Sequence, residues 1–125
     1  MILAPIAAQI IYFAVSRKRE YLADASSAQY TRYPEGLASA LEKLATSNTQ
    51  VQKANKATAP MYIINPLEKR SLSAESLTST HPPIAERIRI LRAMAGGSYA
   101  DYERAYKAAK GGGGIMPVFF VEKKK

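Results

Sequence analysis

The sequence contains no cysteine and only one histidine, His81. Without cysteine the chain forms neither a disulfide framework nor an iron–sulfur cluster, and it has no thiol nucleophile and no cysteine zinc finger. A single histidine is too few for an HExxH zinc-protease motif or for a three-histidine metal site within this chain. These absences exclude the cysteine-based classes and every metal site that needs two histidines from this chain.

Acidic residues are also scarce, since 18 Lys and Arg accompany 10 Asp and Glu, for a formal net charge of +8. A basic excess of this size suits nucleic acid or an anionic membrane surface, or carries no specific meaning. The sequence shows no reading helix or RNA-binding motif, and its apolar N-terminus argues against nucleic acid as a partner. The 125 residues, 47% hydrophobic and 22% charged, are typical of one folded domain or part of one.

The first fifteen residues, MILAPIAAQIIYFAV, are apolar or aromatic at thirteen positions. As a helix they would span about 22 Å, which is less than the roughly 30 Å of a bilayer's hydrocarbon core. A signal peptide fits poorly, because the charged residues follow the run and no A-x-A-like site is present. Three interpretations remain: a buried core helix, an interfacial anchor, or the end of a transmembrane helix. The basic cluster at 17–19 favours the last, since Lys and Arg concentrate on the cytoplasmic side of a span.

Helical spacing of apolar residues continues beyond this run and predicts a mainly α fold, with a long N-terminal helix and about three further helices. The first helix is expected from about residue 5 to residue 29, and Tyr33-Pro34 ends it because the residue before proline avoids the α conformation. Pro34 is favoured in the first turn of a second helix. The buried stripe predicted for that helix is Leu37, Ala38, Ala40, Leu41, Leu44 and Ala45.

Two further helices are predicted in the C-terminal half. Thr80-His81-Pro82-Pro83 begins one of them, and Gly96-Gly97 ends it. Ser98-x-x-Asp101 resembles a capping box at the start of the other. The predicted apolar face of the third helix is Ile84, Ile88, Leu91 and Met94 or Ala95, and that of the fourth is Tyr99, Tyr102 and Tyr106. Between and after these helices we expect a strand or helix at 61–64, a loop at 67–79, a flexible break at 111–114 and a short strand at 115–121.

Glu20 and Asp24 form the first motif that carries chemistry. Residues four apart lie one turn apart on the same helix face, and two carboxylates in that position repel by a few tenths of a kcal/mol. A cation beside them removes the penalty: a metal, an imidazole bound to a metal, or an arginine. The spacing alone favours the simpler alternative, a solvated face on which Arg17 or another basic residue neutralises Glu20.

His81 and Arg87 belong to the second motif, T-H-P-P-x-x-x-R. A lone histidine before two prolines is most simply part of a helix start, with Thr80 as the N-cap candidate. Arg87, further along the helix, is placed to reach back toward an acidic partner. The local alternative is a surface pair between Arg87 and Glu86 that contributes little.

Together the motifs closely resemble, in order, the C-terminal half of the HtpX family of membrane-bound zinc metalloendopeptidases, which are related to the CAAX-prenyl proteases. The segments that carry the resemblance are S-R-x-R-E-Y-x-A-D, P-x-x-L-x-x-A-L-x-x-L, I-x-N-P and T-H-P-P-x-x-x-R-I-x-x-L, within residues 3–106. The resemblance implies a helical fragment of an integral-membrane zinc metalloprotease. Residues 1–15 would end a transmembrane helix, residues 16–110 would form the C-terminal part of the peptidase domain on the cytoplasmic side, and residues 111–125 would be a flexible glycine-rich, basic tail.

The resemblance also implies a role for each candidate site residue. Glu20 matches the glutamate that supplies the third protein ligand to zinc. Asp24 matches the aspartate that supports the ligands, as a carboxylate that orients a zinc-bound imidazole does. His81 matches a histidine near the active site, where an imidazole can hydrogen-bond a developing oxyanion, and Arg87 matches an arginine that holds nearby carboxylates in place.

One part of the family pattern is absent, because the HExxH helix that precedes this region in the family is not in this sequence. Zinc would need two histidines from that segment, and its glutamate would be the general base. We therefore expect this chain alone to bind zinc weakly and to be inactive. The implied partners are a misfolded or membrane protein or peptide as substrate, the lipid bilayer, and the missing N-terminal half of the peptidase. The alternative function is a non-catalytic membrane-associated module that retains the peptidase scaffold.

The two motifs lead to one structural prediction. The physical reason is charge, because two carboxylates that are partly shielded from water need a cationic partner. If the resemblance is correct, the fold brings Arg87 within salt-bridge reach of Glu20 or Asp24, with His81 beside them in a cavity left open by the absent helix. Under the local alternatives, the two motifs have no reason to lie close together in the fold.

Overall fold

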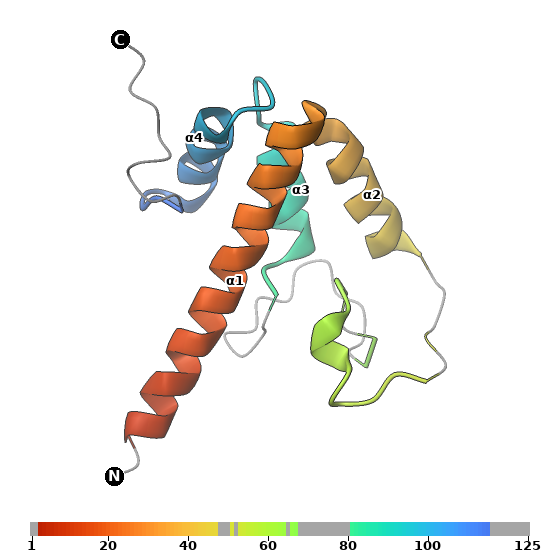
Figure 1. Cartoon of the computed structure of the whole chain (residues 1–125), viewed down its shortest axis with the longest axis vertical. Coiled ribbons are helices and arrows are strands. Elements are labelled where there is room, and N and C mark those ends of the chain that lie inside the picture. The colour runs from red at the N-terminus through yellow and green to blue at the C-terminus, as the bar shows by residue number, and fades with distance from the viewer. Residues whose placement is uncertain (1–2, 48–50, 52, 65, 68–80, 116–125) are drawn as a thin grey trace.

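A computed structural model describes residues 3–47, 51, 53–64, 66–67 and 81–115 of the chain. In this part of the chain the elements are α1 (Leu3–Thr31), α2 (Pro34–Thr46), the 3-10 turn η1 (Ala59–Met61), α3 (Ile84–Arg92) and α4 (Tyr99–Lys110), with no strand. The mainly α prediction is confirmed. Figure 1 shows α1 running the length of the molecule, with α2, α3 and α4 gathered around its C-terminal half.

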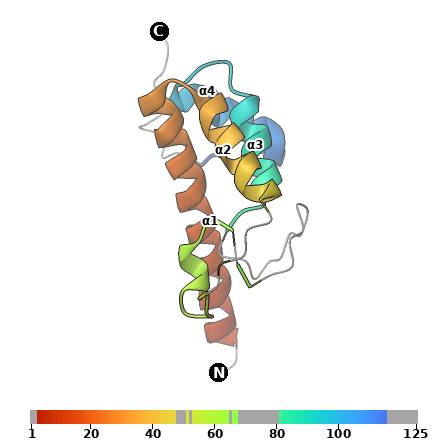
Figure 2. The same cartoon turned by 90° about the vertical axis from the view of Figure 1, so that its right-hand side faces the viewer.

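The two halves of α1 differ sharply in their surroundings. Its buried residues, Tyr21, Asp24, Ala25 and Ala28, all lie in the C-terminal half, where α1 packs on the other three helices. The N-terminal half projects away from them (Figure 2), and Leu3 is 82% exposed and Ile10 61% exposed. The interpretation of residues 1–15 as a buried core helix is therefore wrong for the described residues 3–15. Among the helices that the structure describes, none is both long enough and apolar enough to cross a bilayer.

The turn between α1 and α2 follows the proline signal. α1 ends at Thr31, Arg32 takes the left-handed conformation with φ 55°, and Pro34 occupies the first turn of α2. In α2 only Ala38 and Leu41 are buried. The predicted stripe is too wide, since Ala40 and Leu44 are exposed. Figure 1 shows that α2 diverges from α1 toward its C-terminal end.

The helix α3 lies between α2 and α4 and contacts both, as well as α1. Its buried residues are Arg87, Ile90 and Leu91, while Ile84, Ile88 and Met94 are only partly buried and Ala95 is exposed. The predicted stripe contained Leu91 but missed Ile90 and Arg87. Neighbours on several sides bury more than one narrow face of a helix, which a single stripe does not represent.

The loop from α3 to α4 packs closely on the end of α1. A Cβ atom on Gly97 would lie 2.7 Å from the carbonyl oxygen of Ala28, so this position accepts no side chain without a shift of the backbone. α3 ends at Arg92, before the two glycines that were expected to stop it. Gly97 therefore serves the approach of the loop to α1 rather than the helix end.

The helix α4 begins with the predicted capping box, in which Ser98 and Asp101 each accept from the other's backbone N–H. Gly111 ends it in the left-handed conformation, with φ 73°. Tyr102 and Tyr106 are buried and Tyr99 is partly buried, so the shared tyrosine face is confirmed.

Several sequence predictions fall on other segments. At 61–64 the strand alternative is wrong, since η1 ends at Met61 and bends follow in the described residues. Thr80 and almost all of the loop at 67–79 and of the strand at 115–121 lie outside the described residues, and those predictions stay open.

Candidate functional site

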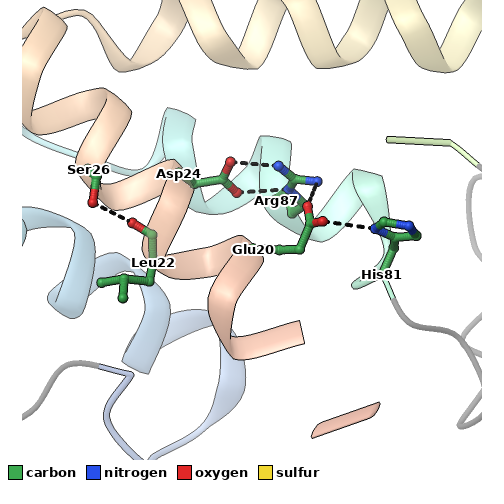
Figure 3. A network of polar contacts seen from close by, with 6 residues as sticks. All are labelled: Glu20, Leu22, Asp24, Ser26, His81 and Arg87. Carbon is green, nitrogen blue, oxygen red and sulfur yellow. Dashed lines mark hydrogen bonds and ion pairs between the residues drawn. The ribbon is translucent and has the colours of Figure 1, made fainter. Parts of the chain in front are cut away.

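The two sequence motifs meet at one place, where α1 crosses α3. Glu20 and Asp24 extend from successive turns of α1, Arg87 extends from α3, and His81 lies just before the start of α3 (Figure 3). The contacting residues are 61 and 63 positions apart along the chain, but their side chains are in direct hydrogen-bond contact. We call these four residues the site cluster.

Asp24 and Arg87 form the buried part of the cluster. The Nε of Arg87 donates to Oδ2 of Asp24 at 2.8 Å, and Nη2 donates to Oδ1 at 2.7 Å. The side chain of Arg87 is 7% exposed and that of Asp24 is 2% exposed. A two-pronged pair of this kind fixes the plane of both groups, and it keeps two buried charges from being left unpaired.

Glu20 extends the cluster toward solvent. Its Oε2 accepts from Nη1 of Arg87 at 2.6 Å, and its Oε1 lies 2.9 Å from Nδ1 of His81. Glu20 is 26% exposed and His81 is 17% exposed, so this end of the cluster is the more accessible one. One guanidinium thus spans both carboxylates, and the imidazole lies at the open end.

The electrostatic environment separates the two carboxylates. The hydrogen bond from His81 and the charge of Arg87 lower the pKa of Glu20, against an opposing effect of burial. Burial raises the pKa of Asp24, although the guanidinium of Arg87 acts in the opposite direction. Burial alone would lower the pKa of Arg87, but the two carboxylates raise it. Glu20 is therefore the carboxylate that stays ionised most readily.

The structure decides between the interpretations of the two motifs. Arg87, and not Arg17, pairs with Glu20. The N-cap of α3 is Pro83, without a side-chain hydrogen bond, and His81 contacts Glu20 instead of acting as a simple cap. The predicted proximity of Arg87 to Glu20 or Asp24 is confirmed, since Arg87 pairs with both acids and His81 contacts Glu20. The catalytic and metal-binding roles of the four residues stay predictions.

The sequence did not predict a second polar network, which joins Tyr21, Glu86 and Lys110. Tyr21 donates a hydrogen bond to Glu86, and Glu86 also pairs with Lys110 of α4 at 2.9 Å. The ring of Tyr21 packs edge-on against Tyr106 with the centroids 5.0 Å apart. No local signal in the sequence pairs Tyr21 with residues so far along the chain. Glu86, which the local alternative paired with Arg87, pairs with Lys110 instead.

The donor set allows a direct test of a metal site. A catalytic zinc takes three protein ligands and keeps one position for water. No group of three His, Asp or Glu side chains that could hold a metal occurs among the residues that the structure describes. Glu20 and His81 present one carboxylate and one imidazole, and both carboxylate oxygens are already engaged. The described residues therefore do not form a zinc site by themselves.

Comparison with known proteins agrees with the sequence motifs. Residues 1–95 match the model of peptidase family M48. The chain is 60% identical over 93 residues to a protease HtpX homolog of Dictyoglomus turgidum, covering 74% of this chain and 30% of that protein. It is 56% identical over 95 residues to one of Syntrophobacter fumaroxidans, covering 74% and 33%. The chain thus spans about a third of the length of these curated relatives. No solved structure matches.

Proposed function

This chain belongs to peptidase family M48, and we propose that it is the C-terminal portion of an HtpX-like zinc-dependent metalloendopeptidase that cleaves membrane or misfolded proteins. The observation that carries the proposal is the convergence of Glu20, Asp24, His81 and Arg87 at one crossing of α1 and α3. A chance pairing of solvated charges would not place four polar residues from two distant motifs in one partly buried network.

Within this proposal Glu20 is the zinc ligand that this chain contributes, and two histidines of an HExxH segment complete the set. The support is that Glu20 has a lowered pKa and lies at the more exposed end of the cluster. Zinc, when bound, would supply the activation of a water molecule. Because the described residues do not form that site alone, we assign no reaction step to the metal.

The other three residues act on position and charge. Arg87 holds the Asp24 carboxylate by two parallel hydrogen bonds, so Asp24 is a rigid acceptor for a neighbouring imidazole. The same guanidinium restrains Glu20 from the side opposite His81. His81, at the accessible end, is suited to hydrogen-bond an oxyanion that develops on a substrate carbonyl.

We also propose that residues 1–15 end a membrane span and that the peptidase region lies on the cytoplasmic side. The support is the exposed apolar surface of the N-terminal half of α1, which includes Leu3, Ile6 and Ile10. Exposed Lys18 and Arg19 follow it directly, as basic residues do at the cytoplasmic end of a span.

One observation favours a second candidate, a non-catalytic module that retains the scaffold. Arg87 already pairs with both carboxylates, so neither of them lacks a cationic partner when no metal is bound. In that case the four residues would hold α1 against α3 and take no part in hydrolysis.

A chimaera separates the two candidates. Residues 1–95 of this chain would replace the matching segment of the Dictyoglomus turgidum relative, and zinc content and cleavage of unfolded casein would be measured. We expect bound zinc and cleavage, with both lost on Glu20→Gln and both retained on Glu42→Gln, a matched change at an exposed glutamate that also pairs with an arginine. A folded chimaera that holds no zinc supports the non-catalytic module. Full activity of the Glu20→Gln form contradicts the assignment of Glu20.

A further inference from the structure

Tyr102 of α4 is the residue that the site as described leaves unexplained. Its side chain is fully buried, and its hydroxyl is the only buried side-chain polar atom without a hydrogen-bond partner among the described residues. A buried hydroxyl that makes no hydrogen bond is unfavourable, and nearly all such groups in folded proteins have a partner. The burial of the Tyr102 hydroxyl without a hydrogen-bond partner therefore needs a physical explanation.

The place of Tyr102 in the fold suggests the reason. The helix α4 packs against both α1 and α3, the two helices that carry the site cluster. Tyr102, Asp24 and Arg87 are all buried, and they come from three helices that all contact one another. Burial raises the pKa of Tyr102, and the next largest cause is the charge of Asp24, while Arg87 opposes it. The phenol thus lies within electrostatic reach of the buried ion pair.

The ion pair has hydrogen-bonding capacity to spare. Arg87 has five N–H donors, and three of them are used, two toward Asp24 and one toward Glu20. Each oxygen of Asp24 accepts one hydrogen bond in the structure, and a carboxylate oxygen has room for a second. A phenolic hydroxyl both donates and accepts, so it complements either partner. Hydrogen bonds to charged groups are stronger than those between neutral groups.

We propose that Tyr102 is a positioning residue of the site cluster, whose hydroxyl hydrogen-bonds the Asp24–Arg87 pair from the α4 side and restrains the guanidinium that spans Asp24 and Glu20. The role of this contact in a peptidase site rests on the proposed function, but the contact itself does not. Tyr102 also lies beyond residues 1–95, which match the family model, so family membership alone does not assign it a role.

The test is a measurement on the whole 125-residue chain by NMR. The exchange rate of the Arg87 Nε–H proton with water reports how firmly the guanidinium is held. We expect Tyr102→Phe to raise this rate about tenfold, as loss of one hydrogen bond to a charged group predicts, and to lower the urea midpoint. Tyr106→Phe is the matched control, since Tyr106 lies one turn further on α4 and packs on Tyr21. It should leave the Arg87 proton unchanged.

A Tyr102 that merely fills space gives a different result. Removal of an orphaned hydroxyl would leave the Arg87 exchange rate unchanged and the urea midpoint equal or higher, and that outcome overturns the proposal. A measurement on the unsubstituted chain decides the matter if Tyr102→Phe does not fold. We expect a slowly exchanging Tyr102 hydroxyl proton with a nuclear Overhauser effect to the Arg87 guanidinium, and its absence also overturns the proposal. Neither measurement involves zinc or cleavage, so failure of the peptidase proposal would be visible separately.

Discussion

Two arginines on α3 make the same kind of contact in different surroundings. Arg87 spans Glu20 and Asp24 of α1, and Arg92 spans Glu35 and Glu42 of α2. The Arg87 side chain is 7% exposed and its contact with Asp24 is buried, whereas Arg92 and its two partners are all more than 40% exposed. The comparison shows that the number of ion pairs is a poor guide to how much each arginine stabilises the fold. Water around Arg92 replaces its partners almost without loss, but nothing replaces those of Arg87.

The largest expected effect is that of Arg87→Met. The substitution leaves the Asp24 carboxylate buried without a cation, so we expect the free energy of unfolding to fall by about 3–5 kcal/mol. Urea unfolding followed by circular dichroism measures it. Arg92→Met is the matched control on the same helix, and it should change the urea midpoint very little. Equal losses in the two variants would contradict the difference between the two clusters.

A smaller loss is expected when both buried partners are removed together. The double variant Asp24→Asn with Arg87→Met leaves no unpaired buried charge, so it should be more stable than the sum of the two single variants predicts. The double-mutant cycle should give a coupling of about 1–3 kcal/mol. A coupling near zero would show that Asp24 and Arg87 contribute independently. That result would refute the buried pair as a unit.

A smaller effect is expected on how the stability of the chain depends on pH. The folded pKa of Glu20 lies below its ordinary value of 4.5, so its stabilising contribution is present above that pH and is lost as the pH falls through the lower folded value. Urea midpoints measured between pH 6 and pH 3 should therefore drop less steeply for Glu20→Gln than for the unsubstituted chain. Asp24, whose pKa burial raises, contributes in the opposite sense. Identical pH profiles for the two proteins would argue against the contact with His81.

The smallest expected effect concerns salt. At 0.1 M ionic strength, the interaction between exposed charges decays over a Debye length of about 10 Å, and this length shortens as salt is added. Buried pairs are screened much less. Addition of 0.5 M NaCl should abolish whatever small difference Arg92→Met makes. It should leave most of the difference made by Arg87→Met. A loss of both differences in salt would place Arg87 in surroundings as wet as those of Arg92.

The local elements were predictable because their signals are local. Pro34 begins α2 because its ring suits the first helical turn, and Ser98 with Asp101 begins α4 through a reciprocal cap. The buried faces were less predictable. Leu44 is apolar but exposed, and Arg87 is charged but buried. Whether a face is buried depends on which helix packs opposite, and local spacing does not contain that information.

The sequence by itself determined that Glu20 and Asp24 share one face of a helix, because four residues make about one turn, and that His81 and Arg87 belong to the start of another. It also carried the family motifs in order. The tertiary structure alone decided that Arg87 pairs with both acids, that Tyr21 pairs with Glu86, and that Tyr102 is buried. The physical reason is that a helix positions its own residues through short-range backbone bonds, whereas the partner of a buried charge is set by how α1, α3 and α4 cross.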